Sequence, residues 1–96
     1  KAFVKPSRAN PIPELERLSV AAIIDKVDQL IKPFKTSVPI NIVDSITSID
    51  PTVHPNGTIS GANWDGKIFL FRDSLGSMSE VADTLFHELL HFGFRR

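Results

Sequence analysis

The sequence contains no cysteine, carries no net charge and has no long apolar run. Without cysteine there can be no disulfide, no thiolate zinc site and no cysteine nucleophile, so any transition-metal site must use His, Asp, Glu and water. Eleven acidic residues balance eleven basic ones, which leaves no electrostatic footprint for nucleic acid. The longest apolar run, Val20 to Ile24, is too short for a membrane span or a signal peptide. We therefore expect no nucleic-acid partner and no membrane, and a location in the cytoplasm is slightly favoured.

The sequence does contain enough apolar material for one core. Its 96 residues, 42% of them hydrophobic, are typical of a single small globular domain. Residues 1–12 carry two prolines and no periodicity, which predicts an extended arm, followed by one domain at residues 13–96. The chain begins at Lys1 and ends at Arg96, shortly after its last motif. We expect it to belong to a larger polypeptide, with the domain truncated at its C-terminus.

The first half of the domain is predicted to form a helix and a strand. Pro13, followed by two glutamates, is typical of a helix start. Apolar residues then recur at helical spacing until Pro33, which cannot continue the helix. Alternation over Val38 to Val43 indicates a half-buried strand, with Pro39 near its start or on a sheet edge.

The second half is predicted to form a β-hairpin and a helix. Asp65-Gly66, between strands at Thr58–Trp64 and Lys67–Phe71, is a dipeptide favoured in two-residue turns because both positions need positive φ. Ser77 and Glu80 fit a capping box for a helix from about Met78 to about Phe92. The order helix, strand, hairpin, helix indicates an α+β domain.

The last helix separates two kinds of side chain. With about 100° per residue, His91 and Asp83 fall within about 40° of His87, and Glu88 falls about 100° away. The apolar residues occupy the opposite side: Met78, Val81, Ala82, Leu85, Leu89 and Phe92. The histidines are therefore predicted to face away from the core, either as metal ligands or as plain solvent-facing residues.

The spacing of the two histidines suits a zinc ion. Imidazoles one helical turn apart can each place a nitrogen about 2.0 to 2.1 Å from the same metal. Glu88 would then flank the metal within reach of a bound water, as a general base does. Asp83, one turn before His87, is a candidate for an extra ligand or for a hydrogen bond to a histidine N–H.

His87-Glu88-Leu89-Leu90-His91 resembles the zincin metallopeptidase signature, in which two His bind zinc and the Glu is the general base. The similarity extends upstream to Gly66, since a strand, a turn and an active-site helix in this order resemble gluzincin-type peptidases. The preceding long helix and small sheet resemble the N-terminal half of the zincin fold. The resemblance implies a zinc-dependent metallopeptidase that acts on a peptide or protein substrate bound along an edge strand within Thr58 to Phe71.

The sequence departs from the zincin pattern after the second histidine. The metzincin extension requires glycine at position 94, which is Phe94, and its third histidine would lie beyond Arg96. Gluzincins take their third ligand, a glutamate, from a later helix that these 96 residues do not contain. We therefore expect the isolated chain to hold zinc weakly and to be weakly active or inactive. The alternative is a catalytically inactive zincin-like binding or structural module.

Four other residues invite a functional interpretation, and for each a structural one is favoured. His54 lies in a turn and is expected to be a solvated loop residue rather than a ligand. Asp65 and Asp73 are explained by the hairpin turn and by the loop before the last helix. Trp64 is expected to pack in the core, although in a peptidase it could wall the cleft.

Overall fold

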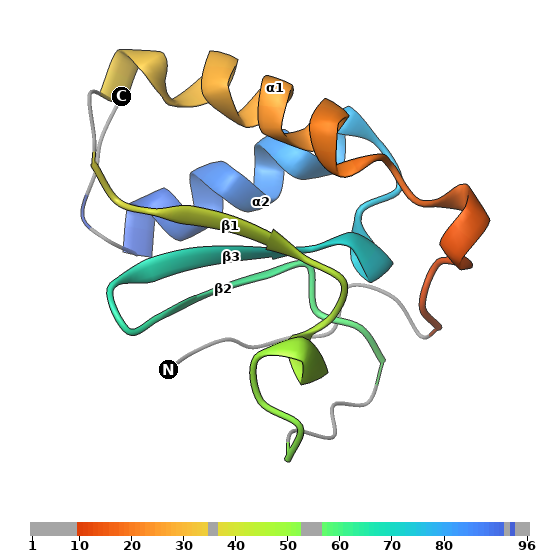
Figure 1. Ribbon diagram of the computed structural model, residues 1–96. Coiled ribbons are helices and arrows are strands. Elements are labelled where there is room, and N and C mark those ends of the chain that lie inside the picture. Colours follow the sequence, from red (N-terminus) through yellow and green to blue (C-terminus); the bar gives the residue numbers. More distant parts are fainter. Residues whose placement is uncertain (1–9, 35–36, 53–56, 92, 94–96) are drawn as a thin grey trace.

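Two helices cover one face of a three-stranded sheet (Figure 1). The structure is a computed structural model and describes residues 10–34, 37–52, 57–91 and 93. Helix α1 spans Val20–Ile31 and helix α2 spans Met78–His91. Single 3-10 turns lie at Glu14–Glu16, Lys32–Phe34, Ile46–Ser48 and Arg72–Ser74. The chain therefore has the predicted α+β architecture, and within the described residues no helix is long and apolar enough to cross a membrane.

The sheet is mixed, with strand order β1-β3-β2. Strand β1 (Ile40–Val43) is parallel to β3 (Lys67–Phe71), whereas β2 (Gly61–Trp64) is antiparallel to β3. Of the two hairpin strands, β3 is thus central and β2 is an edge strand. The sequence did not distinguish between these two arrangements. Among the described residues no further strand pairs with the outer side of β2.

The hairpin turn has the predicted geometry. Asp65 has φ of 57° and Gly66 has φ of 73°, so both turn residues adopt the left-handed conformation that a two-residue hairpin requires. Strand β3 has the predicted bounds, while β1 and β2 are shorter than predicted because they begin at Ile40 and Gly61.

The predicted start of the first helix was wrong. Pro13 precedes only a 3-10 turn, and α1 begins at Val20, where the Ser19 hydroxyl accepts a hydrogen bond from the N–H of Ala22 at 3.1 Å. The residues of the 3-10 turn bury nothing, and Leu15 is 98% exposed. Since a helix of this length is stable only when it buries an apolar face, the helix forms where that face begins.

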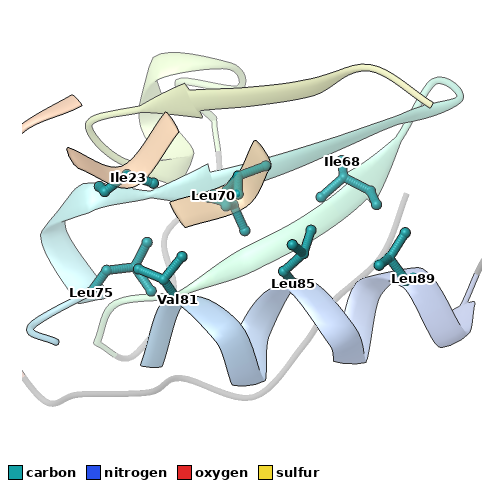
Figure 2. Packing of buried hydrophobic residues seen from close by; sticks show 8 residues of the cluster. Ile23, Ile68, Leu70, Leu75, Val81, Leu85 and Leu89 are labelled. Atoms are coloured by element: carbon teal, nitrogen blue, oxygen red, sulfur yellow. The ribbon is translucent and has the colours of Figure 1, made fainter. Parts of the chain in front are cut away.

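The main core fills the space between the sheet and the two helices. Figure 2 shows Val81, Leu85 and Leu89 projecting from α2 toward Ile68 and Leu70 of β3. The buried members of this core also include three residues outside α2 and β3: Ile23, Val27 and Leu75. The apolar stripe predicted for the last helix therefore anchors α2, and it leaves the opposite side of this helix free of core contacts.

A second, smaller cluster covers the other face of the sheet. Phe71 of β3 packs there with Ile59 and Ala62, and the loop after β1 contributes Ile46 and Ile49. Val43, predicted to point away from the core, packs against this second cluster. The strands are therefore covered on both faces, which explains why β1 shows uniform half-burial instead of the predicted alternation.

Two arginines fasten the segment before α1 to the end of the sheet. Arg72 donates to the Asp44 carboxylate at 2.7 Å and to the carbonyl of Leu18 at 3.0 Å. Arg17 lies 3.9 Å from the same Asp44 carboxylate oxygen and donates to the carbonyl of Ile12 at 2.7 Å. Ile12 is itself buried, and its N–H donates to the carbonyl of Asp73 at 2.9 Å. The end of the predicted arm is thus held against the domain, while residues 1–9 lie outside the described part of the chain.

Asp73 makes the stability of the fold depend on pH. Asp73 is 8% exposed, and its Oδ1 accepts no hydrogen bond from the described residues. Burial raises the pKa of this carboxyl above 3.8, although Arg17 opposes the shift. The pKa of Asp73 is therefore higher in the folded state than in the unfolded state. The protonated carboxyl stabilises the fold fully below the unfolded-state pKa, and this contribution is lost as the pH rises through the folded-state pKa.

We therefore expect Asp73→Asn to change how stability depends on pH. The unfolding free energy of the wild type minus that of the variant should decrease between about pH 3 and about pH 7. Urea denaturation of both proteins at several pH values measures this difference. A difference that increases with pH would contradict the assignment.

Candidate metal centre

Helix α2 presents its two histidines on the side away from the core. The Ser77 hydroxyl accepts a hydrogen bond from the N–H of Glu80 at 3.2 Å, and the Glu80 carboxylate accepts one from Gly76 at 2.6 Å. These contacts fix the start of the helix, and the buried leucines fix its rotation. His87 and His91 are consequently exposed. Their ring centroids lie 4.5 Å apart, with an angle of 51° between the ring planes.

This geometry suits a shared metal ion. Two imidazoles on one tetrahedral zinc ion, each bound through a nitrogen about 2.0 to 2.1 Å away, place their ring centroids roughly 5 Å apart. The observed separation of 4.5 Å is close to this value. Neutral imidazole nitrogens are good zinc ligands, and both rings are accessible to solvent. The centroid separation is thus compatible with two ligands of one zinc ion.

Glu88 is the buried member of the motif. Its side chain is only 5% exposed, and its Oε1 accepts a hydrogen bond from Asn63 Nδ2 at 2.9 Å. The Glu88 side chain thus extends from α2 toward the edge strand β2. It lies beside the side of the helix that carries the histidines, not on that side. Its second oxygen, Oε2, accepts no hydrogen bond from the described residues.

A glycine in β2 permits this close contact between helix and strand. A Cβ atom at Gly61 would lie 2.5 Å from Thr84 Cγ2 and 3.1 Å from the Phe69 carbonyl oxygen. It would also lie 3.5 Å from Cγ of Glu88. Gly61 therefore allows α2 to approach the edge strand closely enough for Glu88 to reach Asn63.

We expect Gly61→Ala to destabilise the fold by about 1 to 3 kcal/mol, because the new methyl group overpacks this contact. Thermal or urea denaturation measures the loss. The double variant Gly61→Ala/Thr84→Ser, which removes the Cγ2 atom that the methyl group meets, should recover part of it. Equal stability of Gly61→Ala and the wild type would contradict the close packing of α2 on β2.

Asp83 lies one turn before His87, as the helical spacing predicts. It is exposed and makes no hydrogen bond or ion pair with either histidine. It lines a small polar hollow of about 180 Å³. The other residues lining this hollow are Ser60, Ser74, Glu80 and Thr84. The proposal that Asp83 is an extra ligand or a hydrogen-bond partner of a histidine stays a prediction.

A third metal ligand is not apparent in the part of the chain that the structure describes. No group of three or more His, Asp or Glu side chains converges there. His54, Phe92 and Phe94 lie outside the described residues. Of the two aspartates considered above besides Asp83, Asp65 forms the hairpin turn and Asp73 is buried in the 3-10 turn after β3. The described residues supply two histidines and a glutamate.

Trp64 does not wall the space beside the histidine helix. Successive side chains of a strand point to opposite faces of the sheet, and Asn63 points toward α2. Trp64 therefore points to the other face, where it lines an open hollow of about 510 Å³ with Ile49, Asp65 and Phe69. Trp64 therefore does not lie beside α2, and the suggestion that it walls a substrate cleft stays a prediction.

Asn63, the only described residue that hydrogen-bonds to the Glu88 side chain, was not predicted from the sequence. The hairpin register contained a signal for it. Counting back from the Asp65-Gly66 turn pairs Asn63 with Ile68, which faces the main core. A polar side chain on a core-facing position needs a hydrogen-bond partner, and the nearest polar residue of the packed helix is Glu88.

No protein-family model, no curated protein and no solved structure is significantly similar to this chain. Its function must therefore be argued from the residues and their geometry.

Proposed function

We propose that this chain carries the zinc-binding half of a metallopeptidase site. His87 and His91 would hold the metal, and Glu88 would act as general base. The observation that carries this proposal is the pair of exposed imidazole rings, 4.5 Å apart on one side of α2. Residues four apart on a helix are neighbours on its surface, and at this separation two imidazoles can bind the same zinc ion.

The arrangement of the sheet supports a zincin-like fold. In the zincin interpretation a small twisted sheet packs on the active-site helix, and an edge strand runs beside the metal. Here α2 packs against the sheet (Figure 1), and the edge strand β2 contacts Glu88 through Asn63. This arrangement agrees with the order of elements on which the resemblance was based.

The chemistry we propose is hydrolysis of a peptide bond. When bound, zinc would lower the pKa of a coordinated water toward about 7 and polarise the substrate carbonyl. Glu88 Oε2 would accept a proton from the attacking water as its oxygen bonds to the carbonyl carbon. Glu88 would then deliver this proton to the amine as the C–N bond breaks. The partly buried position of Glu88 strengthens its electrostatic interactions with the reacting groups.

The substrate would be an extended peptide paired with β2. An edge strand offers a row of backbone N–H and C=O groups to a further strand. The outer side of β2 is unpaired by any other described strand, and β2 passes directly beside Glu88. A peptide aligned on this edge would therefore run past the general base.

A second function, a zincin-like binding or structural module without catalysis, is favoured by one observation. The described residues do not supply a group of three converging metal ligands, and catalytic zinc sites use three protein ligands. In that case the fold and the β2 edge would serve to bind a peptide, without hydrolysing it.

Cleavage of a fluorogenic peptide library, with and without zinc, separates the two functions. The assay uses the full-length protein, meaning the larger polypeptide to which this chain is expected to belong. Its activity is measured after a chelator has removed the metal and again after Zn²⁺ is added in excess. We expect cleavage only in the presence of zinc. Peptide binding without cleavage at saturating zinc would favour the binding module.

A further inference from the structure

Asn63 takes part in two features of the proposed site. Its side chain contacts the proposed general base, and its backbone is part of the strand proposed to bind the substrate. Its Nδ2 donates to Glu88 Oε1 at 2.9 Å, and no other described residue hydrogen-bonds to this carboxylate. Asn63 comes from β2, whereas Glu88 comes from α2, 25 positions later. One residue therefore connects the edge strand with the motif helix.

The register of the hairpin shows which backbone groups of β2 point outward. The N–H of Phe71 donates to the carbonyl of Ser60 at 3.0 Å, so Ser60 and Phe71 form a hydrogen-bonded pair. Hydrogen-bonded and non-hydrogen-bonded pairs alternate in an antiparallel ladder. Asn63, opposite Ile68, falls on a non-hydrogen-bonded pair. Its backbone N–H and C=O, like those of Gly61, are therefore directed to the outer side of β2.

We propose that Asn63 is the positioning residue that aligns the general base with a peptide bound to β2. This inference rests on the proposed function. Its backbone would form the ladder hydrogen bonds with the peptide, and its amide would hold Glu88 Oε1. The second carboxylate oxygen, Oε2, is then kept at a fixed place relative to the peptide main chain. The two roles use different atoms of the same residue.

An amide suits this task better than other side chains would. It donates to a carboxylate in a charge-assisted hydrogen bond, which is shorter and stronger than a neutral one. It carries no charge of its own, so it leaves the carboxylate able to accept a proton. In a partly buried position the hydrogen bond also fixes the rotamer of Glu88, and a displacement of about 1 Å in a catalytic group can cost roughly 100-fold in rate.

The separation of backbone and side-chain roles gives a specific kinetic expectation. Asn63→Ala removes the amide but leaves the backbone groups of residue 63 in place. The kcat should therefore fall by about 10- to 100-fold, while KM stays within about twofold because peptide pairing uses the backbone. A purely structural role in joining α2 to β2 would instead lower the Tm and raise KM together with any loss in kcat.

The experiment measures kcat, KM and Tm for four variants of the full-length protein at saturating zinc, and it measures their zinc affinity separately by titrating the metal-free proteins. Asn63→Asp keeps the size of the side chain but replaces the donor with a second carboxylate, and should lower kcat at least as much as Asn63→Ala. Asn63→Gln keeps a donor and should retain more kcat than Asn63→Ala. Gln29→Ala removes an amide that bonds Asp25 on the exposed side of α1 and should leave all four quantities unchanged.

Besides the lower Tm and higher KM that a purely structural role would give, two further results would overturn the inference, and they can be told apart. If the wild type cleaves peptides and Asn63→Ala has the same kcat, Asn63 does not position the base, although the proposed function stands. If the wild type shows no zinc-dependent cleavage, the proposed function fails, and the positioning role fails with it. A fall in kcat with unchanged KM and Tm supports the inference.

Discussion

Glu88→Gln is expected to lower the kcat of zinc-dependent peptide cleavage by about 10²- to 10⁴-fold, the usual contribution of a general base. The substitution is nearly isosteric. The amide oxygen of glutamine can still accept the hydrogen bond from Asn63 Nδ2, so the contact between α2 and β2 is preserved. Only the capacity to take up a proton is removed. The cleavage rate at saturating zinc measures the effect.

Zinc affinity should be nearly the same in Glu88→Gln as in the wild type, since Glu88 lies beside the histidine pair and is not proposed as a ligand. Glu14→Gln, an exposed residue of the first 3-10 turn, is the matched control and should keep full activity. Equal cleavage by Glu88→Gln and the wild type would exclude the general-base role of Glu88.

His87→Ala and His91→Ala are each expected to weaken zinc binding by at least about 100-fold. A single imidazole cannot hold the ion in the two-point geometry that the rings provide. Both side chains are exposed, so neither substitution removes core packing, and the Tm without metal should change little. Isothermal titration with Zn²⁺ at neutral pH, together with thermal denaturation, separates loss of the site from loss of the fold.

The third histidine of the chain provides a matched control for this pair. His54→Ala should leave zinc affinity unchanged, because His54 is expected to be a solvated loop residue. A loss as large as that of His91→Ala would instead make His54 a ligand. Unchanged affinity in all three variants would show that the histidine pair of α2 does not bind zinc.

The local features of the fold were predictable from the sequence where a few neighbouring residues determine them. The Asp65-Gly66 turn and the start of α2 depend on φ preferences and on a cap within four residues. The start of α1 was not predictable in the same way. Pro13 and its two glutamates satisfy the local rules for a helix start, but the helix forms only from Val20, where apolar residues can be buried.

The site was predictable to the extent that it depends on a single helix. Helical spacing alone placed His87 and His91 on the exposed side of α2. The position of Glu88 against β2 depends on a contact between residues 25 positions apart. It depends also on the absence of a side chain at Gly61, which lets the helix approach. Neither condition appears in the helical periodicity, so the sequence did not identify Asn63.

The most direct test of a shared metal site on α2 is a zinc titration followed by NMR. The imidazole resonances of His87 and His91 are recorded at neutral pH while Zn²⁺ is added to the full-length protein. The geometry predicts that the imidazole resonances of both histidines shift together along a single binding curve. The same two sets of resonances in the Glu88→Gln variant should follow the same curve. Rings that stay unshifted, or that shift with separate affinities, would contradict a metal ion shared by this pair.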